Sequence, residues 1–511
     1  MNEPAHSERT TWWEWLLLAI AVATAGVLGF ANLGLPSLWH DELIHVYAGK
    51  EILRTGLPLL LGGPMYTGGP LHSYLLAGVI ALFGDSEAVV RAPTVCFAML
   101  NVLLTYLIAR RLFGRGTALT AAFLLATSPW SVAWSRQARF YTMNQTAYLA
   151  MLVAYWKFGE AASWKRCATW GLGTLGGYVG GLATAPHGIL FLGPLGAYAA
   201  LRAVYERTVR SRWVLALAVV GLAGLVTLAG FYFSLPRQEH DAIFKEGQLL
   251  DAPARPTIDH DQSDSLYYFR FFTNNLSRGY FVLAVGGFAL MLLRERRRGL
   301  FAALSFAAPV FVLNFLIGYR RHRFMFFAYP FFVIACAYAL VRAFEFILSA
   351  RSSIWRLAIT LPLLVFFVRL GISTADLAED SIRVARGDDV TLAVAHPQWR
   401  KPCEYVKAHA DVAAILTTSY LPVYHYVGRV DNWYPSRVVV WERAETGLHG
   451  LEGVEDLKAF VKEHPKGYFI AEYRRFEHSG MFAEDVAWVQ ANMKRVDEAC
   501  SGDITVYAWG M

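Results

Sequence analysis

The 511-residue sequence contains little charge and little cysteine. Asp, Glu, Lys and Arg make up 17% of it, against 55% hydrophobic residues, so the chain is not an ordinary soluble protein. No two of its five cysteines have the CxxC spacing of zinc or thioredoxin-like sites, and repeats of solenoid length are lacking. The net charge of +7 does not indicate nucleic acid as a partner, because the basic residues cluster at the ends of apolar runs.

Long apolar runs dominate the first 371 residues. A membrane-spanning helix needs about 20 apolar residues, within a range of roughly 17 to 25. The sequence therefore predicts about eleven transmembrane helices, at residues 12–33, 92–109, 117–134, 143–157, 167–185, 188–202, 213–235, 279–293, 300–317, 324–341 and 355–370. Three tryptophans flank the first run and mark it as an interfacial anchor rather than a signal peptide.

The short loops between these runs alternate between rich and poor in Lys and Arg. The rich side, which includes 110–115 and 294–298, is predicted to be cytoplasmic. We therefore expect a cytoplasmic (inner) membrane protein with its N-terminus inside and its C-terminal part outside. Segment 71–83 is too short to span and is expected to lie in the interface or to re-enter from outside. The alternative, a short tilted span, would place the arginine-rich loops outside.

These patterns divide the chain at residue 371. Residues 1–371 are predicted to form a transmembrane domain with an external loop at 34–91 and a lid-like external loop at 236–278. Residues 372–511 are predicted to form a soluble α/β domain, since helix-like runs alternate there with strand-like runs. The expected helices are 403–410, 420–427, 454–462 and 483–493, and the expected strands are 412–417, 438–442, 467–472 and 504–508. The fold class is thus an α-helical polytopic membrane protein plus a C-terminal soluble α/β domain.

A polar island, His40-Asp41-Glu42, follows the first apolar run directly. Charged residues beside a membrane helix are costly to hold there, so the pair Asp41 and Glu42 is a candidate functional site. A partly desolvated carboxylate can act as a general base. Asp41 could equally cap the following helix, predicted at 42–53, and spacing alone leaves the two interpretations even.

Glu87 stands at the other end of the same external loop. It could face the same cavity as Asp41 and Glu42. It could also pair with Arg91, four residues further on, at the start of a helix.

Two basic clusters interrupt the positive-inside pattern. One contains Arg136, Arg139 and Tyr141, and the other is the run Arg320–Arg323, which includes Arg321 and His322. A guanidinium group suits phosphate, because its planar fork donates two hydrogen bonds at once. Anchoring to anionic lipid headgroups is the alternative. Two clusters on the side of the paired carboxylates favour a phosphate site.

These motifs occur in an order that resembles a known family. The chain is similar to the C-type fold (GT-C) glycosyltransferases that use polyprenyl-phosphate sugars, the group of aminoarabinose transferases and protein O-mannosyltransferases. The resemblance covers the membrane portion, most firmly residues 35–145 and 319–331. The pieces that carry it are His40-Asp41-Glu42-Leu43, Gly69–Leu76, Phe83–Arg91, Arg111–Gly114 and Arg321–Pro330.

The resemblance implies transfer of a sugar from a polyprenyl-phosphate-linked donor to a lipid, glycan or protein acceptor, on the extracytoplasmic face and with inversion. It implies membrane lipids as further partners. It assigns the base to Asp41, a place in the cavity to Glu87, and the donor phosphate to Arg320, Arg321, His322 and Arg323. From their positions in the chain we also expect Glu42 to take part in catalysis, His40 and His72 to line the acceptor cavity, and Arg139 and Tyr141 to contact the donor phosphate.

The chain also departs from the aminoarabinose transferases. They have Lys-Pro-Pro-Leu where this sequence has Gly68–Leu71, and a second Asp where it has Ala138–Met143. Their late Arg-Tyr is Arg323-Phe324 here. These differences argue against aminoarabinose transfer to lipid A. They weaken any metal assignment, so a divalent cation stays an open alternative with unknown ligands, and the sequence indicates no other required cofactor.

Two alternatives stay open. A non-enzymatic translocase of lipid-linked sugars would also need arginines and a polar cavity, but not a positioned base such as Asp41. A ligase or polymerase of whole oligosaccharides fits the sequence as well. We also predict a disulfide between Cys403 and Cys500, because both lie in the part expected outside the cytoplasm.

Overall fold

The computed structural model describes residues 11–205, 210–234, 266–316, 321–349, 370, 375–386, 397–411, 413–434, 446–448, 450–451, 453–476 and 483–511. Four predictions therefore fall wholly or largely outside the described residues: the last span at 355–370, most of the loop 236–278, the strand 438–442 and the side chain of Arg320.

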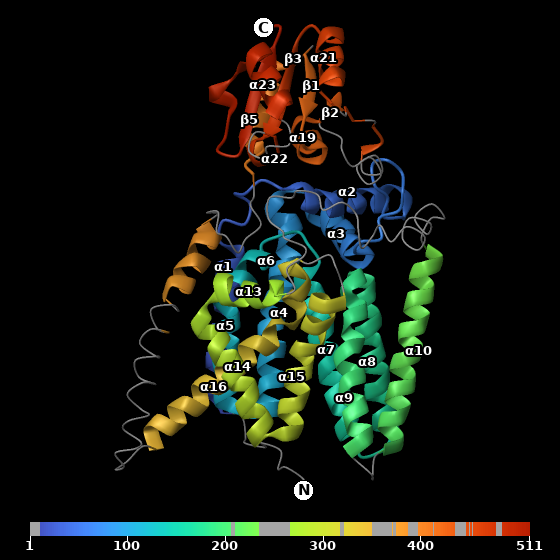
Figure 1. Ribbon diagram of the computed structural model, residues 1–511, viewed down its shortest axis with the longest axis vertical. Helices are drawn as coiled ribbons and strands as arrows, with labels where there is room; N and C mark the ends of the chain where they lie inside the picture. Colours follow the sequence, from blue (N-terminus) through green and yellow to red (C-terminus); the bar gives the residue numbers. More distant parts are fainter. Residues whose placement is uncertain are drawn as a thin grey trace. The chain divides into compact units, whose positions relative to one another are not determined.

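The chain forms two compact units, here called the helical unit and the sheet unit. The helical unit contains Met1–Ala31, Thr94–Arg136 and Phe140–Ala393. The sheet unit contains Asn32–Pro93, Gln137–Arg139 and Val394–Met511. Figure 1 follows the chain through both in colour. The external loop thus shares a unit with the C-terminal sheet, and the predicted domain boundary at residue 371 stays a prediction.

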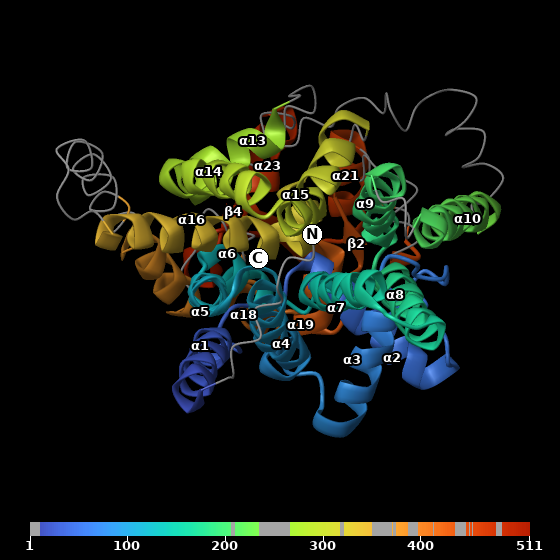
Figure 2. The same cartoon turned by 90° about the horizontal axis from the view of Figure 1, so that it is seen from below.

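Helices make up the described part of the helical unit. They are α1 (Trp12–Phe30), α4 (Glu87–Phe113, which starts in the sheet unit), α5 (Arg115–Ala126), α6 (Pro129–Ser135), α7 (Tyr141–Glu160), α8 (Trp164–Thr184), η1 (Pro186–Phe191), α9 (Leu192–Tyr205), α10 (Arg210–Ser234), α13 (Tyr267–Arg270), η2 (Phe271–Leu276), α14 (Arg278–Arg294), α15 (Arg296–Phe311), η3 (Val312–Leu316), η4 (His322–Ala328) and α16 (Tyr329–Ser349). The end-on view in Figure 2 shows α7 beside α8, α9 beside α10, and α14 beside α16.

Among the described helices, six are long and apolar enough to cross a membrane. A seventh span results if α13, η2 and α14, which bend by 117°, count as one broken span. The chain is thus a multi-pass membrane protein, while the number eleven stays a prediction. Segment 71–83 forms helix α3 (Pro70–Phe83). Its 14 residues rise only about 21 Å, less than the roughly 30 Å hydrocarbon core, so α3 is too short to span, as expected.

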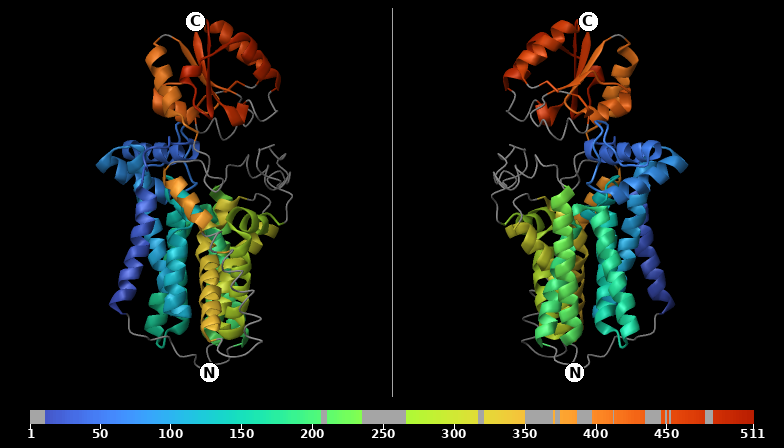
Figure 3. Two further views of the ribbon diagram at one scale, coloured as in Figure 1. Left: turned by 90° about the vertical axis from the view of Figure 1, so that its left-hand side faces the viewer. Right: turned by 90° about the vertical axis from the view of Figure 1, so that its right-hand side faces the viewer.

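The sheet unit contains a five-stranded mixed sheet. Its strands are β1 (Ala414–Thr417), β2 (Asn432–Trp433), β3 (Gly467–Glu472), β4 (Lys494–Arg495) and β5 (Ile504–Trp509), in the order β2-β1-β3-β5-β4. β1 runs parallel to β2 and β3, whereas β5 is antiparallel to β3 and β4. The left view of Figure 3 shows this sheet between its helices.

Side chains from both faces of the sheet are buried, because alternate residues of a strand point to opposite sides. Helices α18 (Arg400–His409) and α19 (Tyr420–Val427) cover one face, packing against Ile470 and Val506. Helices α21 (Val454–Glu463) and α23 (Ala483–Asn492) cover the other, against Phe469 and Tyr507. The remaining short elements are α22 (Tyr473–Phe476) and η5 (Asp497–Ala499). The predicted α/β sheet is confirmed.

The predicted disulfide between Cys403 and Cys500 is wrong, because both are free thiols. Cys403 is fully buried on α18 in the core beneath the sheet. The Cys500 Sγ donates instead to the Val496 carbonyl oxygen at 3.2 Å. Burial raises the pKa of the Cys403 thiol, which keeps it protonated as a core residue.

The external loop packs through helices α2 and α3 onto the C-terminal part of the sheet unit, Val394–Met511, here called the sheet domain. Helix α2 (His40–Thr55) lies against α3 and against α19. Leu43 and Val46 of α2 meet Leu421 of α19 in one buried apolar cluster, which also takes in Trp433 of β2. The segment that carries the polar island is therefore built into the same core as the C-terminal residues.

Candidate active site

Asp41 and Arg139 meet in the sheet unit. Asp41 is the second residue of α2, whose N-cap is Trp39, so Asp41 is not the cap of this helix. Its carboxylate forms an ion pair with the Arg139 guanidinium. The Asp41 side chain keeps 23% of its surface exposed, against 8% for Arg139. The structure thus brings together a carboxylate and a guanidinium that the sequence assigned to different steps, and leaves the carboxylate accessible.

The neighbouring acid, Glu42, is completely buried. Its carboxylate accepts hydrogen bonds from Arg91 Nε at 2.8 Å and Arg91 Nη2 at 2.7 Å. It also accepts from the backbone N–H of Ala138 at 2.7 Å and of Trp39 at 3.3 Å. Ala138 precedes Arg139 and Trp39 caps α2. Glu42 therefore ties the segment that carries Arg139 to the start of the helix that carries Asp41.

Arg91 is the central cation of this support and is also fully buried. Beyond its pair with Glu42, its guanidinium donates to the carbonyl oxygens of Leu33 at 3.0 Å, Pro36 at 2.8 Å and Ser37 at 3.0 Å. One side chain thereby satisfies three buried carbonyls of the chain that approaches α2. Buried polar groups need such partners, since an unmade hydrogen bond costs about 1–3 kcal/mol.

Glu87 does not use Arg91 as its hydrogen-bond partner at i+4. Its carboxylate accepts from Arg400 Nη2 at 2.5 Å and from the Tyr426 hydroxyl at 3.0 Å. These partners come from α18 and α19, far along the chain. Glu87 begins α4 and is therefore the acidic end of a contact between the external loop and the C-terminal helices.

Two buried histidines lie near the ion pair. The rings of His45 and His72 meet edge to face, with centroids 5.0 Å apart. The His45 Nδ1 lies 3.3 Å from the Ser73 hydroxyl and its Nε2 lies 3.3 Å from the Tyr66 hydroxyl. Burial lowers the pKa of His72 to about 4 and the pKa of His45 well below its usual value. Both rings are therefore neutral at physiological pH.

Sequence analysis selected His72 and His40 but missed His45 and Tyr66. A signal for His45 was present, because it follows Asp41 by four residues and so lies on the same face of α2. Tyr66 gives no such signal, since it stands in the glycine-rich loop before α3. His40 begins α2 and is half-buried.

The second predicted basic cluster lies in the helical unit. His322 starts η4 and stacks on Phe271, with ring centroids 5.1 Å apart. The Arg321 carbonyl accepts from the Tyr268 hydroxyl at 3.0 Å, and the His322 N–H donates to the Tyr267 hydroxyl at 3.1 Å. The short helix α13 thus holds the backbone of Arg321 and His322.

Tyr141 and Arg323 belong to the same unit. The Tyr141 ring packs against Trp134, with centroids 4.6 Å apart. The Arg323 guanidinium lies over the ring of Phe324, 5.9 Å from its centroid. The predicted donor residues therefore divide between the units, with Arg139 in the sheet unit and the others that are described in the helical unit.

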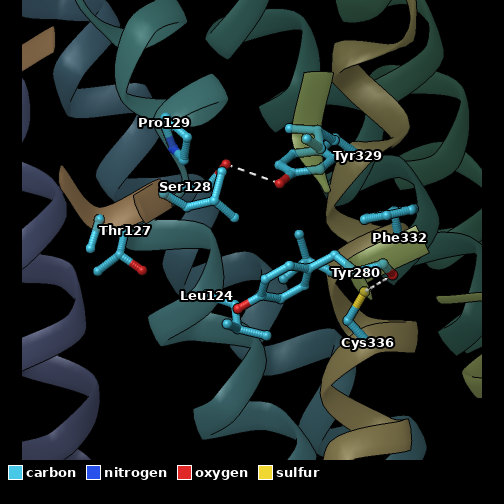
Figure 4. A pocket seen from close by; sticks show the side chains of 12 residues that line it. Leu124, Thr127, Ser128, Pro129, Tyr280, Tyr329, Phe332 and Cys336 are labelled. Carbon is cyan, nitrogen blue, oxygen red and sulfur yellow. Dashed lines mark hydrogen bonds between the residues drawn. The ribbon is translucent and has the colours of Figure 1, made fainter. Parts of the chain in front are cut away.

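A largely apolar pocket opens among α5, α6, α14 and α16 (Figure 4). The Ser128 and Tyr329 hydroxyls are hydrogen-bonded at 2.9 Å along its wall, and the Cys336 Sγ donates to the Tyr280 carbonyl oxygen at 3.2 Å. Phe332 and Leu124 supply apolar surface. Tyr329 directly follows η4, so the pocket begins where the segment with His322 and Arg323 ends.

The described residues contain no group of three or more His, Cys, Asp or Glu side chains arranged to hold a metal ion.

Comparisons with known proteins decide the fold. A family model for dolichyl-phosphate-mannose-protein mannosyltransferases matches residues 67–230. ArnT from Cupriavidus metallidurans bound to undecaprenyl phosphate is similar over 98% of each chain, with 16% identity and a TM-score of 0.62. The chain has the C-type glycosyltransferase fold. Archaeal AglB from Archaeoglobus fulgidus, in complex with an inhibitory peptide and a dolichol-phosphate, also shares it, over 95% of this chain and 72% of that chain, with 14% identity and a TM-score of 0.61.

The resemblance predicted from the sequence motifs is thereby confirmed at the level of the C-type fold. A comparison with curated protein sequences finds no match. Because the identities are 14–16%, these structures establish the architecture of the chain.

Proposed function

We propose that this C-type protein is an integral-membrane glycosyltransferase that moves a sugar from a polyprenyl-phosphate-linked donor to a lipid, glycan or protein acceptor. The observation that carries the proposal is the Asp41–Arg139 ion pair, whose carboxylate stays accessible, on a buried support of Glu42 and Arg91. The bound undecaprenyl phosphate of ArnT and the dolichol-phosphate of AglB support a polyprenyl carrier.

The proposed step is a single displacement with inversion. The acceptor oxygen or nitrogen forms a bond to the anomeric carbon of the sugar, and the bond from that carbon to the phosphate oxygen breaks. The electron pair leaves with the polyprenyl phosphate, and the acceptor proton passes to the Asp41 carboxylate as general base. Since a nearby guanidinium favours the charged form of a carboxylate, Arg139 keeps Asp41 ready to accept that proton.

Arginine side chains have a second role, on the leaving phosphate. Arg139 carries five N–H donors, enough to contact a phosphate while it holds Asp41. We propose Arg320, Arg321, His322, Arg323 and Tyr141 as further residues that bind the donor phosphate. Stabilisation of a departing anion by such groups is usually the largest catalytic contribution. The largely apolar pocket that follows η4 lies where we propose that the lipid chain of the carrier begins.

On the acceptor side we propose His40 and His72. His72 is buried and its ring is neutral. A neutral imidazole has one nitrogen that donates and one that accepts, so it can hydrogen-bond a hydroxyl or an amine of the acceptor. A translocase would have no need for the base at Asp41, which makes enzymatic transfer the better account of this site.

The direct test uses a strain that lacks the protein. Mass spectrometry of its lipid-linked sugars and envelope glycans should show accumulation of one polyprenyl-phosphate sugar and loss of that sugar from one glycan or lipid. Unchanged levels of both in the deletion strain would contradict the proposal.

Substituting Arg321 or Arg323 by Lys, one at a time, should raise the apparent donor constant several-fold for at least one variant. Lysine keeps the charge but cannot reproduce the bidentate geometry of a guanidinium on phosphate. Donor titration with the purified protein measures the effect, and Arg294→Lys, at an exposed position at the end of α14, is the matched control. Headgroup anchoring alone depends on charge and predicts no change in either variant.

We further propose that transfer takes place on the extracytoplasmic face of the cytoplasmic membrane, with the N-terminus inside. Reporter fusions at Gly114 and at Met511 should then report opposite sides. The physical basis is the concentration of Lys and Arg in one set of loops. A cytoplasmic signal from Met511 would show that the chain crosses the membrane one time more or less than predicted, and would reassign the catalytic side.

A further inference from the structure

Two side chains from the C-terminal helices reach the segment that leads into α2. Arg400, the first residue of α18, donates from Nη2 to the Gly34 carbonyl oxygen at 3.0 Å and to the Glu87 carboxylate at 2.5 Å. Its backbone N–H donates to the Ser37 hydroxyl at 3.1 Å. One residue of the sheet domain is thus bonded at three points to the external loop.

Tyr426, from α19, makes the second connection. Its hydroxyl accepts from the backbone N–H of Leu38 at 2.8 Å and donates to the Glu87 carboxylate at 3.0 Å. Burial, and then the adjacent Glu87 charge, raise the pKa of Tyr426, so the hydroxyl keeps its proton at physiological pH. It therefore acts as donor and acceptor at once, and its bond to Leu38 lies one residue before the Trp39 cap and three before Asp41.

We infer that Arg400 and Tyr426 are positioning residues for sugar transfer, which act through Glu87 and the Gly34–Trp39 segment to hold Asp41 in its productive position. The inference rests on the proposed function and gives the C-terminal domain a role in it. The sequence placed Glu87 in the cavity for the sugar acceptor. We instead assign it a structural role, because its carboxylate accepts hydrogen bonds from Arg400 and Tyr426.

Arg91 and Tyr426 bond different backbone groups of this segment, which explains why both are needed to hold it. Arg91 holds carbonyl oxygens of the segment from one side, at Leu33, Pro36 and Ser37. Tyr426 holds the Leu38 N–H, which Arg91 cannot bond because a guanidinium has no acceptor. Without Tyr426 this amide loses its partner, and the turn before α2 loses the restraint nearest Asp41. A displacement of about 1 Å at a catalytic group can cost roughly 10²-fold in rate.

The first experiment compares Tyr426→Phe with Tyr424→Phe in the full-length protein. Both changes remove one hydroxyl from α19, and the Tyr424 ring packs against the apolar cluster that contains Leu43 and Leu421. For Tyr426→Phe we expect a fall in kcat of at least about tenfold with little change in the donor KM. We also expect faster hydrogen exchange in peptides that cover Leu38 and Trp39. Tyr424→Phe should match the parent protein in both measurements.

A second pair guards against loss of folding. Arg400→Lys keeps a charge beside Glu87 but cannot bond Gly34 and Glu87 with the same fork, and it should also lower kcat and loosen the segment. Its control is Arg429→Lys, since Arg429 bonds two carbonyls within the sheet domain, those of Ala410 and Ala413.

The outcomes separate the two claims. Parent-like kcat in Tyr426→Phe and Arg400→Lys, or a lower kcat without faster exchange near Leu38, overturns the positioning role. If the two control variants lose as much kcat as Tyr426→Phe and Arg400→Lys, the contacts of Arg400 and Tyr426 contribute only to the general stability of the domain. If the parent protein transfers no sugar at all, the proposed function fails. The positioning role is then tested by hydrogen exchange alone, and parent-like exchange near Leu38 in the variants refutes it.

Discussion

Asp41→Asn is expected to slow sugar transfer by about 10²–10⁴-fold, the usual cost of losing a general base. Asparagine has nearly the same shape but cannot take the acceptor proton. The Asp41 side chain lies at a partly exposed edge, so the substitution leaves the buried support of Glu42 and Arg91 in place. Turnover of the purified variant at saturating acceptor, together with its thermal midpoint, measures the two effects separately.

The matched control is Asp85→Asn in the same unit. Asp85 pairs with Lys50 at 2.5 Å in a partly exposed ion pair, and ion pairs at the surface contribute at most about 1 kcal/mol. This variant should retain both activity and stability. An Asp41→Asn protein with near-parental turnover would reduce Asp41 to an acidic residue that favours the start of α2, and would make the translocase interpretation the better one.

Glu42→Gln should have the opposite effect, a loss of the folded protein before any specific loss of chemistry. Removing one partner of a buried ion pair typically costs about 3–5 kcal/mol, because the other charge stays buried without compensation. Here Arg91 would be left in that state, with both its side chain and Glu42 almost without solvent contact. We expect a strongly lowered midpoint of unfolding in detergent and a poor yield of folded protein.

Glu51→Gln on the same helix is the control for this loss. Glu51 pairs with Arg54, whose side chain is 72% exposed, so its removal should change the midpoint little. A Glu42→Gln variant as stable as Glu51→Gln would show that Arg91 does not depend on Glu42. The different burial of Asp41 and Glu42 would then have little effect on how much each contributes to stability.

The local conformation of much of this chain follows from its sequence. Helix α19 and strand β3 have the bounds expected from their apolar patterns, and α2 extends its predicted range by two residues at each end. Apolar spacing predicts such elements because it reports which faces of a helix or strand leave water. The same spacing predicts a helix at α3 and, from its length, that it is too short to span.

The partners of the polar side chains could not be predicted in this way. Sequence analysis offered Arg91 to Glu87 because the two are four residues apart. In the structure Arg91 pairs with Glu42, 49 positions away, and Glu87 accepts hydrogen bonds from Arg400, 313 positions away. Sequence analysis also treated Asp41 and Glu42 as one catalytic pair. In the structure only the Asp41 side chain is accessible to solvent, whereas Glu42 is buried.

The sequence by itself therefore determined the membrane-spanning character of the chain, the α/β nature of its C-terminal part and the position of an acidic pair at a helix start. These properties depend on composition and on short-range periodicity. Only the tertiary structure decided which acid is buried, which arginine each acid meets and how the C-terminal helices connect to the segment before Asp41. Those choices depend on which distant segments share one core, and a buried charge takes its partner from whichever segment the packing of that core brings beside it.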